Sequence, residues 1–220
     1  MQTSTALLIA DLVGVAVFAA SGGSAGVAKR LDVFGVVFVG CVAALGGGVF
    51  RDVVIDNFPG GDRLGGAPPL AFADWRYSVV AAAAALLVFW LHPQLARIRR
   101  TVLLLDAAGL GLFTAAGTLK ALDYGVPVVG ACILGMMTGI GGGLLRDLLT
   151  GEIPLVLRRE IYAVAALVGA TIIAVGSRLP DWFGIVVPSL TLLLTAAAVT
   201  CVIRLLAILR NWSAPVARES

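Results

Sequence analysis

The sequence is poor in charged residues and in the residue types from which catalytic and metal sites are built. Charged side chains make up 13% of the 220 residues, about half the usual share in soluble domains. The one histidine, His92, cannot form a metal site by itself. The sequence shows no nucleophile motif, nucleotide-binding loop or metal-ligand cluster. We therefore expect a protein that is not an enzyme and that needs no cofactor or metal.

Cysteine is also scarce, and it gives no sign of redox or metal chemistry. Cys41, Cys132 and Cys201 each lie in an apolar run and form no Cys-x-x-Cys pair, which is typical of small buried hydrophobic residues. Apolar residues, by contrast, make up 60% of the chain, and the mean hydropathy is +1.01. This composition indicates an integral membrane protein. The net charge of +3 is then better explained by basic cytoplasmic loops than by nucleic-acid binding.

Seven apolar stretches are long enough to cross a membrane as helices, which takes about 20 residues each. They are Thr5–Ala28, Val33–Ile55, Tyr77–Leu95, Thr101–Leu119, Val126–Leu149, Glu160–Ser177 and Phe183–Leu209. The first lacks the basic residues that precede the core of a signal peptide. With the N-terminus outside, eleven Lys and Arg residues fall on the inner side and five on the outer side. This split predicts a multi-pass protein of the inner (plasma) membrane with a cytoplasmic C-terminus.

A repeat with an offset of 95 residues organises the first six spans. GGGVFRDVV begins at Gly46, and GGGLLRDLL begins at Gly141. The same offset aligns Asp11 with Asp106, Phe18 with Phe113 and Pro59 with Pro154. We predict a single membrane domain with one repeat at 5–95, a second at 101–177 and an unrepeated helix at 183–209. Because each repeat has three spans, the second is inverted relative to the first, as in many transporters. The predicted fold is all-α, with seven transmembrane helices in a 3+3 inverted repeat plus one.

The repeated motif combines glycines, which weaken a helix, with charges that are costly in a membrane. Three glycines cost a helix about 3 kcal/mol relative to alanines, so we expect a kink or an unwound turn at each triplet. The carbonyls exposed there could replace the water around a cation. An arginine within the membrane usually faces a partner or a hydrated path. The alternative is that each triplet is only a surface for close helix packing.

Each motif arginine has two candidate partners. Asp11 and Arg51 fall at similar depth near the outer side, and Asp106 and Arg146 near the inner side. Since adjacent helical residues do not face each other, we favour these cross-helix pairs over pairing with the neighbouring Asp52 and Asp147. Nearby hydroxyls could line a hydrated path or bond back to their own helices, with neither favoured. These are Ser21, Ser24, Thr114 and Thr118.

From about Thr5 to Leu209, the seven spans and paired GGGxxRD motifs resemble the prokaryotic TRIC (trimeric intracellular cation) proteins, also labelled as glycine transporters. The resemblance implies a homotrimer in membrane lipid, with one pore per protomer inside the first, second, fourth and fifth spans. It also implies permeation by monovalent cations, above all K⁺, with Na⁺ as a second candidate. The segment GVFRD lacks the lysine of the animal lipid-binding motif, so that lipid specificity is not carried over. The implied pore residues are Gly46, Gly47, Gly48, Arg51, Asp52, Gly141, Gly142, Gly143, Arg146 and Asp147, beside Asp11 and Asp106.

Two other functions remain open at this point. A secondary carrier would move a small solute such as glycine and would keep its path closed on one side at all times. A structural or lipid-organising protein would carry no permeant. The sequence does not decide between a channel and these alternatives.

Overall fold

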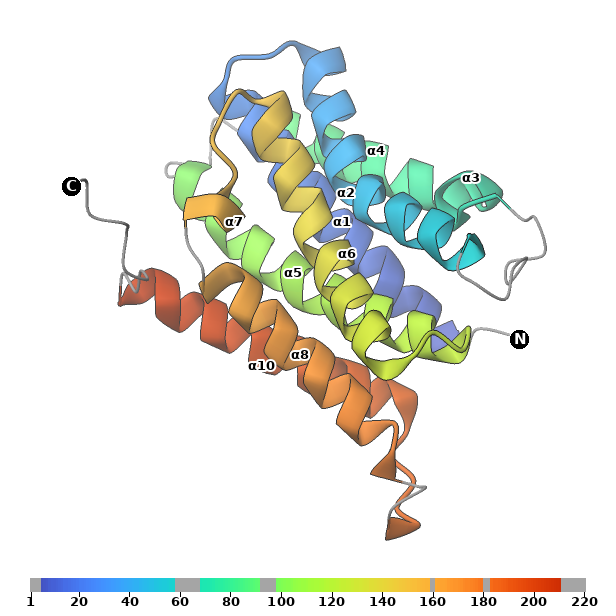
Figure 1. Cartoon of the computed structure of the whole chain (residues 1–220). Helices are drawn as coiled ribbons and strands as arrows, with labels where there is room; N and C mark the ends of the chain where they lie inside the picture. Colours follow the sequence, from blue (N-terminus) through green and yellow to red (C-terminus); the bar gives the residue numbers. More distant parts are fainter. Residues whose placement is uncertain (1–4, 58–67, 92–97, 159–160, 180–182, 211–220) are drawn as a thin grey trace.

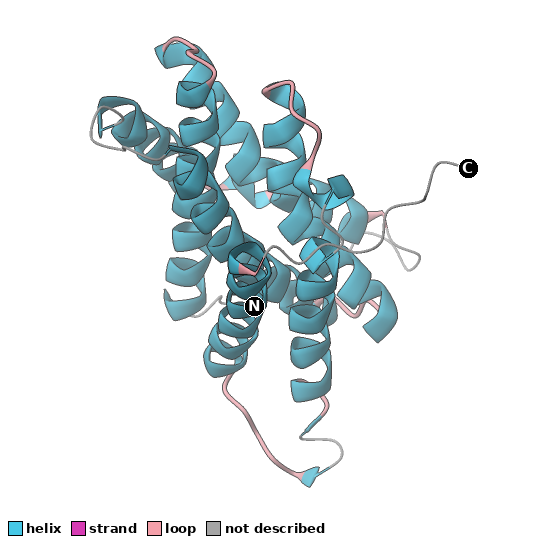
Figure 2. Cartoon of the chain, turned by 90° about the vertical axis from the view of Figure 1, so that its left-hand side faces the viewer, coloured by secondary structure: helices cyan, strands magenta, loops and turns pink. Residues whose placement is uncertain are grey.

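The computed structural model describes the chain except residues 1–4, 58–67, 92–97, 159–160, 180–182 and 211–220. Its helices are α1 (Thr5–Ala28), α2 (Val33–Asp56), α3 (Leu70–Ala73), α4 (Trp75–Leu91), α5 (Ile98–Asp123), α6 (Val128–Leu149), α7 (Leu155–Arg158), α8 (Ile161–Gly176) and α10 (Ser189–Leu209). The described residues contain no strand (Figure 2). The expectation of an all-α fold is confirmed.

The long helices form two sets of three and one additional helix. In the first set α1, α2 and α4 all contact one another, and in the second set α5, α6 and α8 do the same. The two sets meet where α1 packs on α5 and where α2 packs on α6. The additional helix, α10, packs on α5 and α8 (Figure 1). The long helices thus group as three, three and one in chain order, and the inverted repeat itself stays a prediction.

Five of these helices, α1, α2, α5, α6 and α10, are long and apolar enough to cross a membrane. The helices α4 and α8 are apolar but shorter. The expected ends of their spans, Leu95 and Glu160, lie outside the described residues, as do His92 and Pro59. The exact count of seven crossings therefore stays a prediction. One boundary is corrected: α10 begins at Ser189 rather than Phe183, because Pro188 occupies its N-cap.

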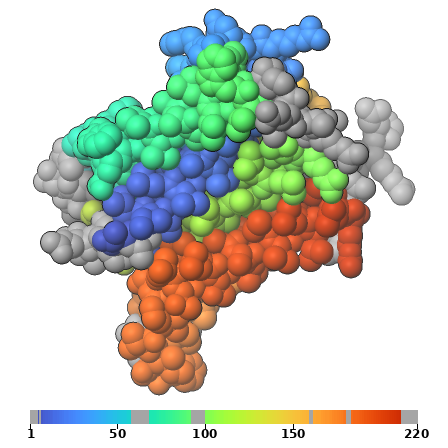
Figure 3. Space-filling model, turned by 180° about the vertical axis from the view of Figure 1, so that it is seen from behind, coloured from blue at the N-terminus to red at the C-terminus, as the bar shows by residue number. Residues whose placement is uncertain are grey.

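The outer surface is apolar over much of its area. Figure 3 shows one face, where α4, α1, α5 and α10 follow one another as parallel bands. Large apolar side chains point outward along the helices; Phe34 is 77% exposed and Trp90 is 73% exposed. An apolar surface on this scale is typical of a protein surrounded by lipid.

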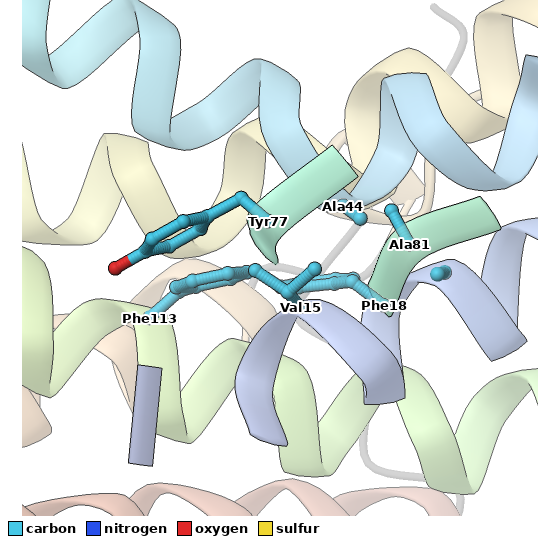
Figure 4. Close-up of a cluster of buried hydrophobic side chains, with 7 residues drawn as sticks. Val15, Phe18, Ala44, Tyr77, Ala81 and Phe113 are labelled. Atoms are coloured by element: carbon cyan, nitrogen blue, oxygen red, sulfur yellow. The ribbon is translucent and has the colours of Figure 1, made fainter. Parts of the chain in front are cut away.

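Two stacked phenylalanines occupy the centre of the molecule. Phe18 of α1 and Phe113 of α5 have ring centroids 5.3 Å apart and an interplanar angle of 11°. Val15, Tyr77 and Ala81 pack around them (Figure 4). Phe18 is fully buried and Phe113 is 4% exposed. The middle of the α1–α5 contact is therefore closed by apolar side chains.

The glycine triplets do not unwind their helices. Both α2 and α6 are continuous α-helices through Gly46–Gly48 and Gly141–Gly143. Figure 1 shows α2 curving along its length while its ribbon stays coiled throughout. The expectation of an unwound turn with exposed carbonyls is wrong.

The triplets instead form the crossing of α2 and α6. A Cβ atom on Gly47 would lie 2.2 Å from the carbonyl oxygen of Thr138, and one on Gly142 would lie 2.4 Å from that of Ala43. Only glycine allows two backbones to approach so closely. Here the alternative interpretation, close helix packing, is the one that the structure supports.

Candidate functional site

The second GGGxxRD motif lies in a buried charged cluster, called the second cluster below: Asp106, Arg146, Asp147, Tyr162 and Arg204. The Arg146 side chain is 1% exposed. Its Nη1 donates to Asp106 Oδ1 at 2.7 Å and to Ser21 Oγ at 2.7 Å. Its Nε donates to Asp147 Oδ1 at 2.8 Å. The predicted pair of Arg146 with Asp106 is confirmed, and the neighbouring aspartate is bound as well.

The first motif lies in a related cluster with different pairing, called the first cluster: Asp11, Arg51, Asp52, Tyr77 and Lys120. Arg51 Nε donates to Asp52 Oδ1 at 2.8 Å, and Lys120 Nζ donates to the same oxygen at 2.8 Å. Asp11 accepts a hydrogen bond from the Tyr77 hydroxyl at 2.7 Å instead of one from Arg51. The expected Arg51–Asp11 ion pair is therefore wrong.

Both motif arginines bind the aspartate that follows them in sequence, against expectation. The rule that adjacent helical residues do not face each other describes where Cβ atoms point. An arginine side chain is long enough to curl around the helix to its neighbour, and its planar group can bind a second partner as well. Arg146 uses that capacity to hold Asp106 and Asp147 together.

Each motif aspartate also fixes the segment that follows its helix. Asp52 Oδ2 accepts the backbone N–H of Leu70 at 3.1 Å, and Asp147 Oδ2 accepts that of Leu155 at 2.9 Å. In both cases the amide begins a short helix directly after a proline, Pro69 or Pro154. The structural counterpart of Pro154 is therefore Pro69 and not the predicted Pro59.

The third glycine of each triplet provides room for these charges. A Cβ on Gly143 would lie 2.7 Å from the Tyr162 hydroxyl and 2.8 Å from Asp106 Oδ1. A Cβ on Gly48 would have only Arg51 Nη2 near it, at 3.9 Å. Gly48 and Arg51 border a cavity of about 20 Å³ that Asp11 also lines, which is room for about one water molecule.

The four candidate hydroxyl residues are all fully buried but differ in role. Ser21 binds Arg146, as described. Thr118 Oγ1 donates to the carbonyl oxygen of Thr114 in its own helix at 2.8 Å, so the back-bonding alternative holds there. The hydroxyls of Ser24 and Thr114 have no hydrogen-bond partner among the described residues.

The two clusters lie at opposite ends of α1 and α5. Asp11 is near the start of α1, whereas Ser21 lies ten residues later. At 1.5 Å per residue the two are separated by roughly 15 Å along the helix axis. The Phe18–Phe113 stack lies between them. The arrangement is a charged cluster toward each end of α1 and α5, with buried apolar side chains between the two clusters.

Four residues of the clusters were not among the predicted site residues: Tyr77, Lys120, Tyr162 and Arg204. Lys120 lies just past the predicted span Thr101–Leu119, but in the structure it lies inside α5 with its side chain only 17% exposed. Arg204 is 1% exposed, and its Cζ lies 4.7 Å from the centroid of the Tyr162 ring. For Arg204 the available signal was a charge inside a predicted span, and for Lys120 it was a charge at the end of one.

Just outside the first cluster, a surface ion pair fixes the start of α4 near Tyr77. Asp74 accepts the backbone N–H of Arg76 at 3.0 Å and three bonds from its guanidinium at 2.9, 2.9 and 2.6 Å. The side-chain hydrogen bond from Arg76 lowers the pKa of Asp74 below its usual value. This carboxylate therefore stays charged and caps the helix over the neutral pH range.

Comparison with known proteins places this arrangement in a family. Residues 8–93 and 103–178 match a family profile described as glycine transporter. The chain belongs to the glycine transporter family. The two matched blocks are separated by residues 94–102.

The chain is also similar to several bacterial membrane proteins. The UPF0126 inner membrane protein YadS of Escherichia coli K12 is 38% identical over 90% of this chain and 89% of its own length. The UPF0126 membrane protein of Deinococcus radiodurans is 44% identical over 73% of this chain and 71% of its own.

Solved structures extend the family likeness to the fold. The TRIC trimeric intracellular cation channel orthologue from Rhodobacter sphaeroides has a TM-score of 0.82 and 32% identity, covering 95% of this chain and all of that one. A second TRIC cation channel has a TM-score of 0.79 and 30% identity over 96% and 97% of the two chains. The resemblance to TRIC proteins inferred from the sequence is confirmed, and the chain is an all-α membrane protein.

Proposed function

We propose that this protein is a monovalent cation channel permeable to K⁺, with one pore within each protomer of a homotrimer. The pore is lined by α1, α2, α5 and α6 and ends at the two charged clusters. The N-terminus lies outside the cell membrane and the C-terminus in the cytoplasm. The first six long helices act as a 3+3 inverted repeat.

One observation carries the proposal. Two related clusters of buried acidic and basic side chains lie at opposite ends of the same two helices, in a chain that shares the fold of TRIC cation channels at 32% identity. Buried charge at membrane depth is costly and is usually retained along an ion path. The carboxylates of Asp11 and Asp106 supply negative charge for a cation at either end.

In the proposed pore, the stacked phenylalanines form a closed constriction between the two clusters. The Phe18 and Phe113 rings fill the space between the clusters, and a dry apolar constriction blocks ions by excluding water. Conduction therefore requires α1 and α5 to move apart or the two rings to rotate.

A secondary carrier of a small solute such as glycine is the second candidate. Besides the family description, the unequal clusters favour it. At the second cluster Arg146 binds Asp106 across the helices, whereas at the first cluster a small cavity borders Arg51 and Asp11. A carrier that opens one side at a time would have unequal ends in each of its states.

Electrical recording of purified protein in planar bilayers with K⁺ solutions distinguishes the two candidates. Discrete steps of picoampere size establish a channel, because carrier turnover is too slow to produce them. Uptake of labelled glycine into vesicles without such steps would overturn the channel proposal and favour the carrier. Chemical cross-linking of the purified protein tests the trimer independently.

A further inference from the structure

The small cavity at the first cluster brings together polar groups that do not contact one another. Its volume is about 20 Å³, and its polar border includes Asp11, Arg51 and Tyr77. Asp11 Oδ2 accepts the Tyr77 hydroxyl at 2.7 Å. Asp11 Oδ1 is buried and has no hydrogen-bond partner among the described residues. A buried carboxylate oxygen without a donor is costly, so this atom points to a ligand in the cavity.

Arg51 carries donors near Asp11, but open space separates the two groups. The Nε of Arg51 donates to Asp52 at 2.8 Å. Its Nη2 lies 3.9 Å from the position that a Cβ on Gly48 would take, and apart from the local helix backbone no other described atom lies within 4 Å of that position. Since Gly48 also borders the cavity, the end of the guanidinium lies at the edge of the space that this glycine leaves open.

The equivalent place in the second cluster is filled. Gly143 stands at the repeat offset from Gly48, and a Cβ on it would lie 2.7 Å from the Tyr162 hydroxyl and 2.8 Å from Asp106 Oδ1. There Arg146 Nη1 reaches Asp106 directly, at 2.7 Å. The second cluster thus links its arginine and aspartate without an intermediate, whereas the first cluster has room between the same two groups.

The chemistry of these two groups determines what can fill that room. A carboxylate oxygen only accepts hydrogen bonds, and a guanidinium only donates them. A bridging ligand must therefore donate to Asp11 and accept from Arg51. A monovalent cation cannot accept from the guanidinium, an anion would face the carboxylate, and a cavity of this volume holds about one water molecule. Water donates and accepts, and the hydroxyl oxygen of Tyr77 offers it a third partner.

We propose that this cavity is a binding site for one water molecule, which joins Asp11 Oδ1 to the Arg51 guanidinium. Gly48 keeps the site open, because a side chain at this position would extend into it. Asp11 and Arg51 are then linked through water rather than by a direct ion pair. Val15 and Phe113 also border the cavity, so in the proposed channel the bound water lies against the apolar constriction. That consequence rests on the proposed function, but the water site does not.

X-ray radiolytic labelling of the purified protein, read by mass spectrometry, tests the site, because hydroxyl radicals formed from a bound water oxidise the side chains beside it. We expect Tyr77 to be oxidised in the parent, and Tyr162 of the second cluster to be oxidised several-fold less. Gly48→Ala should lower the oxidation of Tyr77 several-fold, since the methyl group takes the place of the water, and should leave Tyr162 unchanged. Equal oxidation of Tyr77 in the parent and in Gly48→Ala would overturn the proposal.

A density map of the parent that shows ordered waters is a second measurement, and it needs no variant. We expect a peak within hydrogen-bond distance of both Asp11 Oδ1 and an Nη atom of Arg51, unchanged when Tl⁺ replaces K⁺ in the buffer. A cavity without density would refute the water site, and a peak with anomalous signal from Tl⁺ would replace the water with a cation. Absence of current from the parent in planar bilayers would refute the channel proposal alone, because neither measurement depends on permeation.

Discussion

The unequal pairing of the two motif arginines predicts unequal costs for the same substitution. Arg146 binds two carboxylates, those of Asp106 and Asp147, whose side chains are 0% and 10% exposed. Arg146→Met keeps much of the side-chain volume but removes the positive charge that binds both acids. Breaking a buried pair in this way costs about 3–5 kcal/mol. For a chain of this size, that corresponds to a fall in Tm of roughly 10 °C.

Arg51→Met is the matched control. Loss of the Arg51 guanidinium removes one charged hydrogen bond, the bond to Asp52, which is worth about 1.5–3 kcal/mol. Asp52 keeps Lys120 Nζ at 2.8 Å and the Leu70 amide at 3.1 Å, so its charge stays compensated. The expected fall in Tm is then about half that of Arg146→Met, at roughly 5 °C.

Thermal unfolding of detergent-purified protein, followed by loss of the monodisperse peak in size-exclusion chromatography, measures both values. Adding Asp106→Asn to Arg146→Met should recover part of the loss, because the buried charge left without its arginine is then neutral. Equal Tm values for the two arginine variants would refute the reasoning from pairing. A failure of Asp106→Asn to recover any stability would refute the ion-pair contribution itself.

Three further predictions use other features. Gly142→Ala should lower Tm strongly, because its Cβ would lie 2.4 Å from the Ala43 carbonyl oxygen. Gly48→Ala should be tolerated, because only Arg51 Nη2 lies near that Cβ, at 3.9 Å. Comparable Tm values for the two variants would contradict the close crossing. Lys120→Met should lower Tm, because it removes a partner of the Asp52 side chain, which is 2% exposed. Lys29→Met is the control: it breaks an ion pair with Glu152, whose side chain is 56% exposed, and should leave Tm nearly unchanged. A cysteine at Thr3 should react with an impermeant thiol reagent from the periplasmic side in a background lacking the native cysteines; reaction from the cytoplasm only would reverse the proposed orientation.

The sequence correctly predicted the Arg146–Asp106 pair but wrongly predicted the Arg51–Asp11 pair. The difference comes from the side chains around each aspartate. The offset of 95 places Asp11 and Asp106 in equivalent positions, and backbone equivalence is all that such an offset can indicate. In the first cluster the Tyr77 hydroxyl donates a hydrogen bond to Asp11, and Lys120 Nζ donates one to Asp52. A choice among several donors within reach of one carboxylate depends on side-chain geometry, which the repeat pattern does not contain.

The tyrosines were missed because the offset changes within the repeat. From α3 onward the structure pairs Leu70 with Leu155 through the motif aspartates, an offset of 85. Tyr77 and Tyr162 have that same spacing of 85, since the connection after the first motif is ten residues longer than the one after the second. A search at a fixed offset of 95 therefore aligned Pro154 with Pro59 and passed over both tyrosines.

The glycine triplets show a limit of helix propensity as a guide. Propensity measures the cost of glycine in an isolated, solvated helix. In α2 and α6 the triplets are buried against each other, and packing of the two backbones offsets that cost. The motif was recognisable from the sequence, but its effect on each helix depended on the other helix, whose backbone packs against the triplet.

The close crossing of α2 and α6 gives the molecule a pivot. Backbone lies directly against backbone where Gly47 meets Thr138 and Gly142, so no side chain interlocks the two helices at that point. Gly47 lies nine residues from the end of α2 and fourteen from its start, which makes two lever arms of about 13 and 21 Å. A rotation of about 10° would swing the tips of these arms by roughly 2 and 4 Å. Arg51 and Asp52, four and five residues from Gly47, would move by about 1 Å, which is enough to lengthen the 2.8 Å hydrogen bond from Lys120 to Asp52 beyond the usual range. The two arms move in opposite directions, so a rigid rotation of α2 that disturbs the first cluster also displaces the far end of the same helix.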